Sequence, residues 1–346
     1  MEARENWLRA VEFRYPEWIP CSVGFSPLTW NRYRQDLERI VLAHPRIFPR
    51  YRPGQADFFD EMPAVYRQGE YYRDNWGCLW YNIQGGLEGQ VVEHPLADWR
   101  ALETYRMPDP LLLEERGPRD WAKIERAIAE QKAQGLLTVG NGERLFDRLY
   151  FLRGWDNLML DFALEPPELA RLIGMLEEYE LKLIQKWIGL GVDVIGFHTD
   201  IGTQKGLMIS PASFRKYIKP MFKRLFQTCR QAGIHVSLSS DGCLLEIVDD
   251  LVECGVSVHD PQLRANTLDG IARAYKGKLC ANVDLDRQSF PFLTPAQIRE
   301  QIKEVVEVMG APEGGLMLMA AIYGDDVPLR NIEAICEAME DYCFPS

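Results

Sequence analysis

The second half of the chain alternates between two apolar patterns. Apolar residues recur at helical spacing over long stretches, and each stretch ends near a glycine that is followed by a short, continuously apolar run. The pattern predicts helices over residues 167–190, 213–232, 244–254, 267–276, 295–309 and 331–342. It predicts strands over residues 192–197, 234–238, 256–258, 279–283 and 316–321, and further strands over 19–23 and 136–139.

Helices that alternate with buried strands favour right-handed βαβ crossovers and a parallel sheet. Seven or so strands in 346 residues favour an α/β fold of the closed (β/α)8 TIM-barrel type. No G-x-G-x-x-G motif follows a strand, which counts against a dinucleotide-binding sheet. We therefore expect residues 1–346 to form one barrel domain. The aromatic- and glycine-rich segment 51–110 breaks the rhythm and is expected to add hairpins as a decorating insertion.

The charge balance and the apolar runs of the sequence exclude several classes of protein. Lys plus Arg number 39 and Asp plus Glu 51, which gives a formal net charge of −12. An acidic chain without a basic run is not expected to bind nucleic acid. The sequence has no apolar run long enough for a membrane span and no apolar block typical of a signal peptide, so we expect a cytoplasmic protein with no membrane association. The eight cysteines are dispersed, which is typical of reduced thiols.

Polar residues follow most of the predicted strands. In a parallel barrel such residues converge on one mouth, where carboxylates and histidines can act as general acids. The candidates for catalysis are His198, Asp200, Asp241, His259 and Tyr323. The competing interpretation is that many polar residues at a barrel mouth only cap helices or bind loop amides. A zinc ion on His198, Asp241 and His259 is one reading of the same residues, but their spacing is not diagnostic.

Several stretches resemble the uroporphyrinogen decarboxylase superfamily. The first is RENWLRAVEFRYPEWIPCSVGF, followed by DNWGCLW and VVEHPLADWRALETYRMPDP. Next come ERLFDRLYFLRGWDNLMLDFALEPPEL and TDIGTQKGLMISPASFRKYIKPMFKRLFQTCRQAGIHVSLSSDG. DPQ, NVDLDRQ and GGLMLMAAIYGDDVPLRNIEAICEAM complete the match. The resemblance covers essentially the whole chain and implies a single (β/α)8 barrel with its site at the carboxyl mouth.

The superfamily contains decarboxylases and corrinoid-linked methyltransferases, and the resemblance favours the second branch. The decarboxylases carry an R-Q-A-G-R loop after the first strand, where this chain has GFSPLTWNRYR. The thiol-activating methyltransferases carry H-x-C and a later Cys as zinc ligands. Here the corresponding positions hold Ser239, Ser240 and Asp241, and Ala320 and Ala321 before Tyr323. The resemblance is therefore closest to the methyltransferase components of O-demethylase systems.

This resemblance implies an enzyme that moves a methyl group from a small, for example methoxylated aromatic, molecule to Co(I) of a separate corrinoid protein. The five catalytic candidates would protonate the leaving oxygen or hold a metal. Trp30, Trp76 and Trp80 would wall an aryl substrate, although packing within the hairpins is the competing role for Trp76 and Trp80. Glu143 and Asn282 are further substrate-binding candidates. Two alternatives stay open: a decarboxylase-like lyase on a small acid or on uroporphyrinogen, and a non-catalytic barrel that binds a tetrapyrrole or a corrinoid protein.

Overall fold

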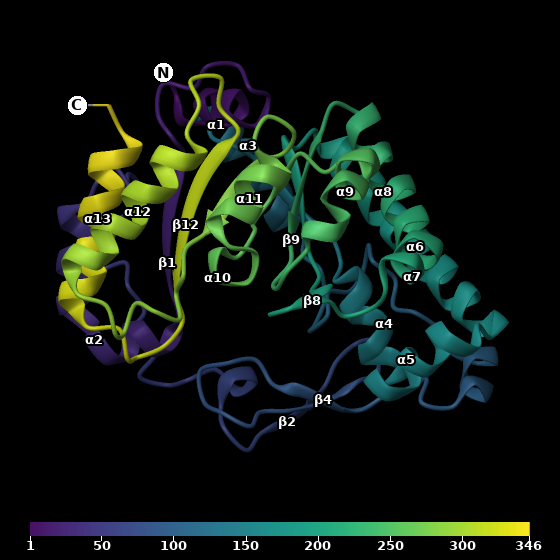
Figure 1. Ribbon diagram of the computed structural model, residues 1–346. Helices are drawn as coiled ribbons and strands as arrows, with labels where there is room; N and C mark the ends of the chain where they lie inside the picture. The colour runs from purple at the N-terminus through teal and green to yellow at the C-terminus, as the bar shows by residue number, and fades with distance from the viewer. Residues whose placement is uncertain (346) are drawn as a thin grey trace. The chain divides into compact units, whose positions relative to one another are not determined.

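The computed structural model describes residues 1–345 as an α/β protein in which parallel strands alternate with helices along the chain (Figure 1). This arrangement confirms the predicted TIM-barrel-like class. The chain divides into two compact units. Unit 1 comprises Met1–Gln68, Gln84–Leu87 and Asp260–Ser346, and unit 2 comprises Gly69–Ile83 and Glu88–His259. The expectation of a single domain stays a prediction.

Unit 1 contains three parallel strands with β12 in the middle: β1 (Cys21–Phe25), β12 (Leu316–Ile322) and β11 (Cys280–Asp284). Its helices are α1 (Ala3–Val11), α2 (Pro27–Ala43), η1 (Ala64–Tyr66), α10 (Leu263–Asn266), α11 (Leu268–Tyr275), α12 (Pro295–Met309) and α13 (Leu329–Cys343). Figure 1 shows α12 and α13 packed side by side next to β1 and β12. The apolar residues that recur at helical spacing in α12 and α13 therefore contribute to the core of this unit.

Unit 2 contains four parallel strands in the order β10 (Val258–His259), β9 (His235–Ser239), β6 (Val194–His198) and β5 (Val139–Asn141). The helices that connect them are α3 (Trp121–Ala133), α4 (Leu145–Arg153), α5 (Trp155–Leu164), α6 (Pro167–Leu190), α7 (Pro211–Ser213), η3 (Phe214–Ile218), α8 (Lys219–Gln231), η4 (Leu245–Ile247) and α9 (Val248–Cys254). Two short strands, β7 (Gly202–Thr203) and β8 (Gly206–Leu207), pair beyond the end of β6.

The predicted insertion contributes an antiparallel sheet to unit 2, as expected for hairpins. Its strands are β2 (Tyr71–Arg73), β3 (Leu79–Tyr81) and β4 (Gln90–Glu93), and η2 (Trp99–Glu103) follows them.

The predicted elements agree closely with the structure. Each predicted parallel strand is present within one to three residues of its expected bounds, and the helices predicted over 167–190 and 295–309 have those limits. The predicted helix over 213–232 divides into α7, the π-helical turn η3 and α8. Gly191 ends α6 with a φ of 61°, a left-handed conformation that favours glycine over residues with a Cβ.

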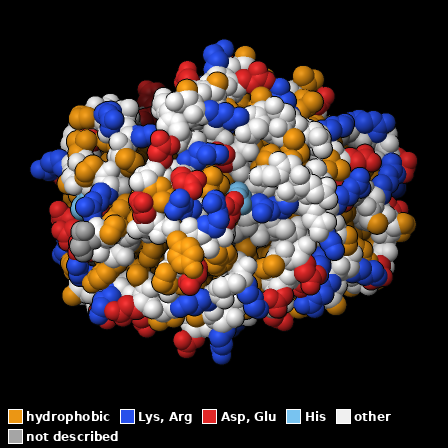
Figure 2. All heavy atoms as spheres, turned by 90° about the horizontal axis from the view of Figure 1, so that it is seen from above, with side chains coloured by type: hydrophobic (Ala, Val, Ile, Leu, Met, Phe, Trp, Pro, Cys, Tyr) orange, Lys and Arg blue, Asp and Glu red, His pale blue; other side chains and the backbone are white. Residues whose placement is uncertain are grey.

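Charged side chains of both signs lie interspersed on the face that Figure 2 draws, with apolar groups scattered between them. No helix among the described residues is long and apolar enough to cross a membrane.

Candidate functional site

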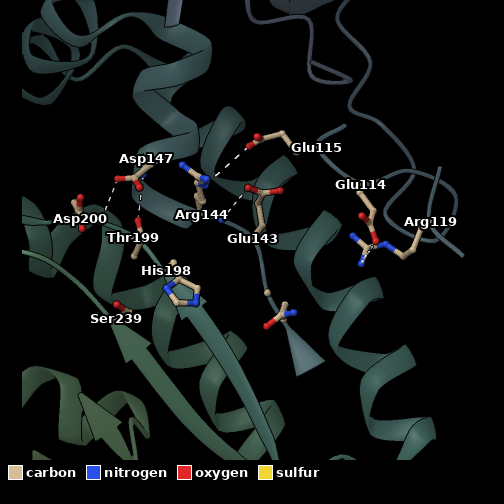
Figure 3. A pocket seen from close by; sticks show the side chains of 12 residues that line it. Glu114, Glu115, Arg119, Glu143, Arg144, Asp147, His198, Thr199, Asp200 and Ser239 are labelled. Atoms are coloured by element: carbon tan, nitrogen blue, oxygen red, sulfur yellow. Dashed lines mark hydrogen bonds and ion pairs between the residues drawn. The ribbon is translucent and has the colours of Figure 1, made fainter. Parts of the chain in front are cut away.

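A polar cavity of about 510 Å³ lies in unit 2 at the carboxyl ends of β5, β6 and β9 (Figure 3). Its volume lies within the range of small-molecule sites. The residues that line it are Glu114, Glu115, Arg119, Asn141, Gly142, Glu143, Arg144, Asp147, His198, Thr199, Asp200 and Ser239. Carboxylates and basic groups dominate this lining.

Strand register explains why the cavity forms at this place. His198 pairs with Ser239, and Asn141 pairs with Gly196, so β5, β6 and β9 end at the same edge of the sheet. The residues that follow these ends then share one opening. His198, Asp200 and Glu143, which the sequence predicted as site residues, all line the cavity. Their catalytic and binding roles stay predictions.

Two carboxyl groups, Asp147 and Asp200, form the acidic corner of the cavity. The Asp200 backbone N–H donates to Asp147 Oδ1 at 3.0 Å, and Figure 3 shows the two side chains near Thr199. Thr199 Oγ1 accepts hydrogen bonds from the N–H groups of Phe146 and Asp147 at 2.7 and 3.2 Å. Burial, and then the negative charge of Asp200, raise the pKa of Asp147 to about 7. Asp147 is therefore able to exchange a proton near neutral pH.

His198 stands at the end of β6 with its ring at the cavity. The side chain is exposed, but the protein around it still reduces the hydration of a charged ring. This desolvation, followed by the nearby Arg144 charge, lowers the pKa of His198. A lowered pKa favours the neutral imidazole, which can accept a proton or a hydrogen bond.

Asp241 meets the site through its backbone. Its N–H donates to Asp200 Oδ1 at 2.9 Å, and its own side chain is exposed. His259, at the end of β10, is fully buried, and this burial lowers its pKa to about 3. His259 is therefore neutral over the physiological pH range. Neither residue is among those that line the cavity.

Among the described residues, the structure does not bring the predicted zinc ligands together. Over the described residues 1–345, no group of three or more His, Cys, Asp or Glu side chains is placed to hold a metal ion. His198, Asp241 and His259 accordingly form no ligand set, because a zinc site needs at least three protein ligands. Zinc binding stays a prediction.

A buried arginine binds two of the carboxylates that line the cavity. Arg148 on α4 has no exposed surface, and its guanidinium contacts Glu115 at 2.7 Å, Glu143 at 2.9 Å and Asp74 at 3.4 Å. It also lies over the Trp76 ring at 4.4 Å. Burial opposes the charge of Arg148, but the carboxylates outweigh this effect and raise its pKa.

Trp76 and Trp80, which were predicted as substrate walls, lie in the core of unit 2. Each is about 1% exposed, and the Trp80 indole N–H donates to Asp74 Oδ2 at 2.8 Å. Neither lines the cavity. Packing, the competing interpretation, describes their position in this structure.

The three other candidates belong to unit 1. Tyr323, just beyond β12, is half exposed and lines a separate hollow of about 370 Å³, where Arg287 lies 5.1 Å from its ring. Trp30 stacks on Tyr51 with ring centroids 6.2 Å apart. Asn282 Nδ2 lies 3.4 Å from the sulfur of Met319 on the neighbouring strand.

Sequence reasoning missed the contribution of α4. Arg144 and Asp147 line the cavity, and Arg148 pairs with the lining residue Glu143. A usable signal was present: the α4 sequence LFDRLYFLR has apolar residues on all sides of the helix, which predicts that the helix and its charged residues are buried. Charges spaced three and four apart within such an apolar segment indicate a buried polar network.

The fold and cavity place this chain among TIM-barrel-like proteins whose polar site lies at the carboxyl ends of parallel strands, the position where enzymes of this class act. A family model described as uroporphyrinogen decarboxylase (URO-D) matches residues 85–342, about three quarters of the sequence. The chain belongs to the URO-D family, as its motifs predicted. Family membership indicates an enzyme.

Individual relatives agree with this assignment. Two proteins named uroporphyrinogen decarboxylase, from two strains of Thermus thermophilus, are each 25% identical over 272 residues, 73% of this chain and 72% of theirs. A solved structure titled methyltransferase from Methanosarcina mazei covers 98% of both chains with a TM-score of 0.65 and 18% identity. This likeness shows the fold.

Proposed function

We propose that the protein is a methyltransferase that moves a methyl group from a small molecule to Co(I) of a corrinoid protein. The observation that carries the proposal is the cavity at the ends of β5, β6 and β9. It combines a carboxyl pair with a neighbouring histidine in a chain of the URO-D family. The similarity to a solved methyltransferase supports the same branch.

The charges of the cavity support a small substrate over a polycarboxylate. Five carboxyl groups line it, those of Glu114, Glu115, Glu143, Asp147 and Asp200. The basic side chains in the lining are Arg119, Arg144 and His198. Arg144 already pairs with Glu88 at 2.8 Å, and Arg119 lies 3.8 Å from Glu114. A substrate with many carboxylates would meet a repulsive field here.

The reaction needs an acid or a hydrogen-bond donor beside the leaving atom, and this cavity contains candidates for that role. Co(I) attacks the methyl carbon and displaces an oxygen or sulfur leaving group, so negative charge develops on the leaving atom. Acidic groups or hydrogen-bond donors close to that atom lower the barrier. The carboxyl groups of Asp147 and Asp200 and the imidazole of His198 line one hollow, where such contacts can form. The corrinoid is a co-substrate that its own carrier protein brings to the opening.

The direct test is a methyl-transfer assay. Purified protein is mixed with a corrinoid protein reduced to Co(I), or with free cob(I)alamin, and a panel of methoxylated compounds. We expect the methyl-cobalt absorbance to appear with at least one compound and only when the protein is present. Failure to form methyl-cobalt across a broad panel that includes non-aromatic ethers would contradict the proposal.

A decarboxylase is the second candidate, and the two Thermus relatives favour it. The test is carbon dioxide release from uroporphyrinogen, measured under anaerobic conditions beside a uroporphyrinogen decarboxylase as positive control. We expect no release above the background. Stoichiometric release by this protein would replace the methyltransferase proposal with a lyase.

A further inference from the structure

Asp147 occupies an unusual position for a charged residue. It lies in the first turn of α4, its side chain is 6% exposed, and it nevertheless lines the cavity. Its Oδ1 accepts the Asp200 N–H at 3.0 Å, and the Tyr150 hydroxyl hydrogen-bonds its carboxyl group. The contacts fix the orientation of the carboxyl group at the cavity wall.

Two neighbouring carboxyl groups in such a place do not ionise alike. Asp200 accepts the Asp241 N–H at 2.9 Å, a hydrogen bond that favours its carboxylate form. Asp147 is the more buried member, and the charge of Asp200 acts on it. When the surroundings of two neighbouring acids move their pKa values apart, one acid is a carboxylate and the other keeps its proton and can donate it.

The other groups that face Asp147 do not reverse this assignment. Arg144, the residue just before α4, favours the carboxylate form of Asp147, and so do the hydrogen bonds from Tyr150 and Asp200. Burial and the Asp200 charge outweigh them, so the pKa of Asp147 is still raised to about 7. His198 has a lowered pKa, which makes it a poor source of a proton at neutral pH.

We propose that Asp147 is the catalytic proton donor of the cavity and that the methyl donor is therefore an ether or thioether. This inference rests on the methyl transfer proposed above. A donor with a poor, anionic leaving group needs a proton at the departing atom. A sulfonium or quaternary ammonium donor releases a neutral group and needs none.

The step balances without an outside reductant or oxidant. The Co(I) electron pair forms the cobalt–carbon bond, and the carbon–oxygen pair leaves with the oxygen. The Asp147 proton passes to that oxygen, which gives an alcohol or phenol, methyl-Co(III) and the Asp147 carboxylate. Proton uptake from water restores the acid for the next turnover.

The experiment compares the wild type with Asp147→Asn across aryl methyl ethers of graded leaving-group acidity and a methylsulfonium donor. Asparagine keeps an oxygen to accept the Asp200 N–H but has no proton to transfer. We expect the rate with an unactivated ether to fall about 10²- to 10⁴-fold. The loss should shrink towards nitro-substituted ethers and vanish for the sulfonium. Asp156→Asn, an exposed position on α5 outside the cavity, is the matched control and should keep the wild-type rates.

The outcomes separate the two proposals. An equal loss with every ether, or no loss at all, overturns the role of Asp147 while methyl transfer stands. A wild type that forms no methyl-cobalt with any donor overturns both. The wild type alone supplies a second readout, because proton donation makes its rate depend only weakly on leaving-group acidity. A steep dependence in the wild type would refute proton donation even if the variant did not fold.

Discussion

Arg148 offers the sharpest test of how the cavity is built. Replacing it with methionine removes the cation and keeps a side chain of similar length. Glu115, Glu143 and Asp74, which lie within 2.7 to 3.4 Å of its guanidinium, then lose their shared partner. The stacking of the guanidinium on Trp76 is lost as well.

The expected cost is large because the side chain is completely buried. Removing one partner of a buried ion pair destabilises a protein by about 3–5 kcal/mol, since the remaining charges are left in a poorly hydrated site. The lost cation–π contact adds up to about 2 kcal/mol, and methionine packing offsets part of this. We expect the free energy of unfolding to fall by about 3–5 kcal/mol overall.

The assay is guanidinium-induced unfolding followed by circular dichroism, with Arg171→Met as the matched control. Arg171 also pairs with a glutamate at 2.9 Å, but both side chains are exposed, so its loss should cost about 0–1 kcal/mol. The deficit of Arg148→Met should shrink from pH 8 to pH 5. Burial already raises the pKa of Asp74, and without the cation proton uptake by the buried carboxyl groups should stabilise the folded variant as pH falls.

Two results would refute this reasoning. If the free energy of unfolding of Arg148→Met lay within about 1 kcal/mol of that of Arg171→Met, the buried ion pairs of Arg148 would not stabilise this part of the protein. If its deficit grew on acidification, the carboxylates would not be the source of the instability.

Three further predictions concern stability. Gly142→Ala should cost about 1–3 kcal/mol, because a Cβ there overlaps the Phe197 ring and lies 2.9 Å from Glu180 Oε1; thermal unfolding measures this. His259 has a folded-state pKa of about 3, below its unfolded value, so its contribution to stability is full above about pH 6.5 and is lost as pH falls. His259→Gln should flatten the decline between pH 7 and pH 5 in urea unfolding, and an unchanged slope would contradict this. Asp147 has a raised folded-state pKa of about 7, so the wild type should lose stability relative to Asp147→Asn as the pH rises from 5 to 9, by about 3 kcal/mol, with the opposite trend counting against the assignment.

Much of the fold could be predicted from periodicity because its elements are locally encoded. The helix α6 is bounded by Pro167 and Gly191, and its buried residues repeat at helical spacing. The strand β6 is a run of four buried residues that ends at His198. Register then brings the strand ends together, so the rule that sites form at the carboxyl ends of parallel strands located half of the cavity.

The other half depends on contacts that no local pattern encodes. Glu115 comes from a loop, and it reaches Arg148 on α4 across 33 residues of sequence. Periodicity treats charged residues as solvated, so it does not by itself identify Asp147 and Arg148 as buried partners within α4. The two tryptophans mislead for the opposite reason. Their size suggests a ligand wall, yet both are buried: Trp76 packs against Arg148, and the Trp80 indole N–H donates to Asp74.

Four carboxyl groups of the cavity fall into two pairs that differ in their hydrogen-bond partners. Glu115 and Glu143 are bound to Arg148, so their charges are compensated and their positions fixed. Asp147 and Asp200 have backbone N–H groups as partners and act on each other's ionisation. In the second pair, burial and the charge of Asp200 raise the pKa of Asp147. We therefore expect proton transfer at this cavity to involve the Asp147–Asp200 pair, with the arginine-bound glutamates forming part of the cavity wall.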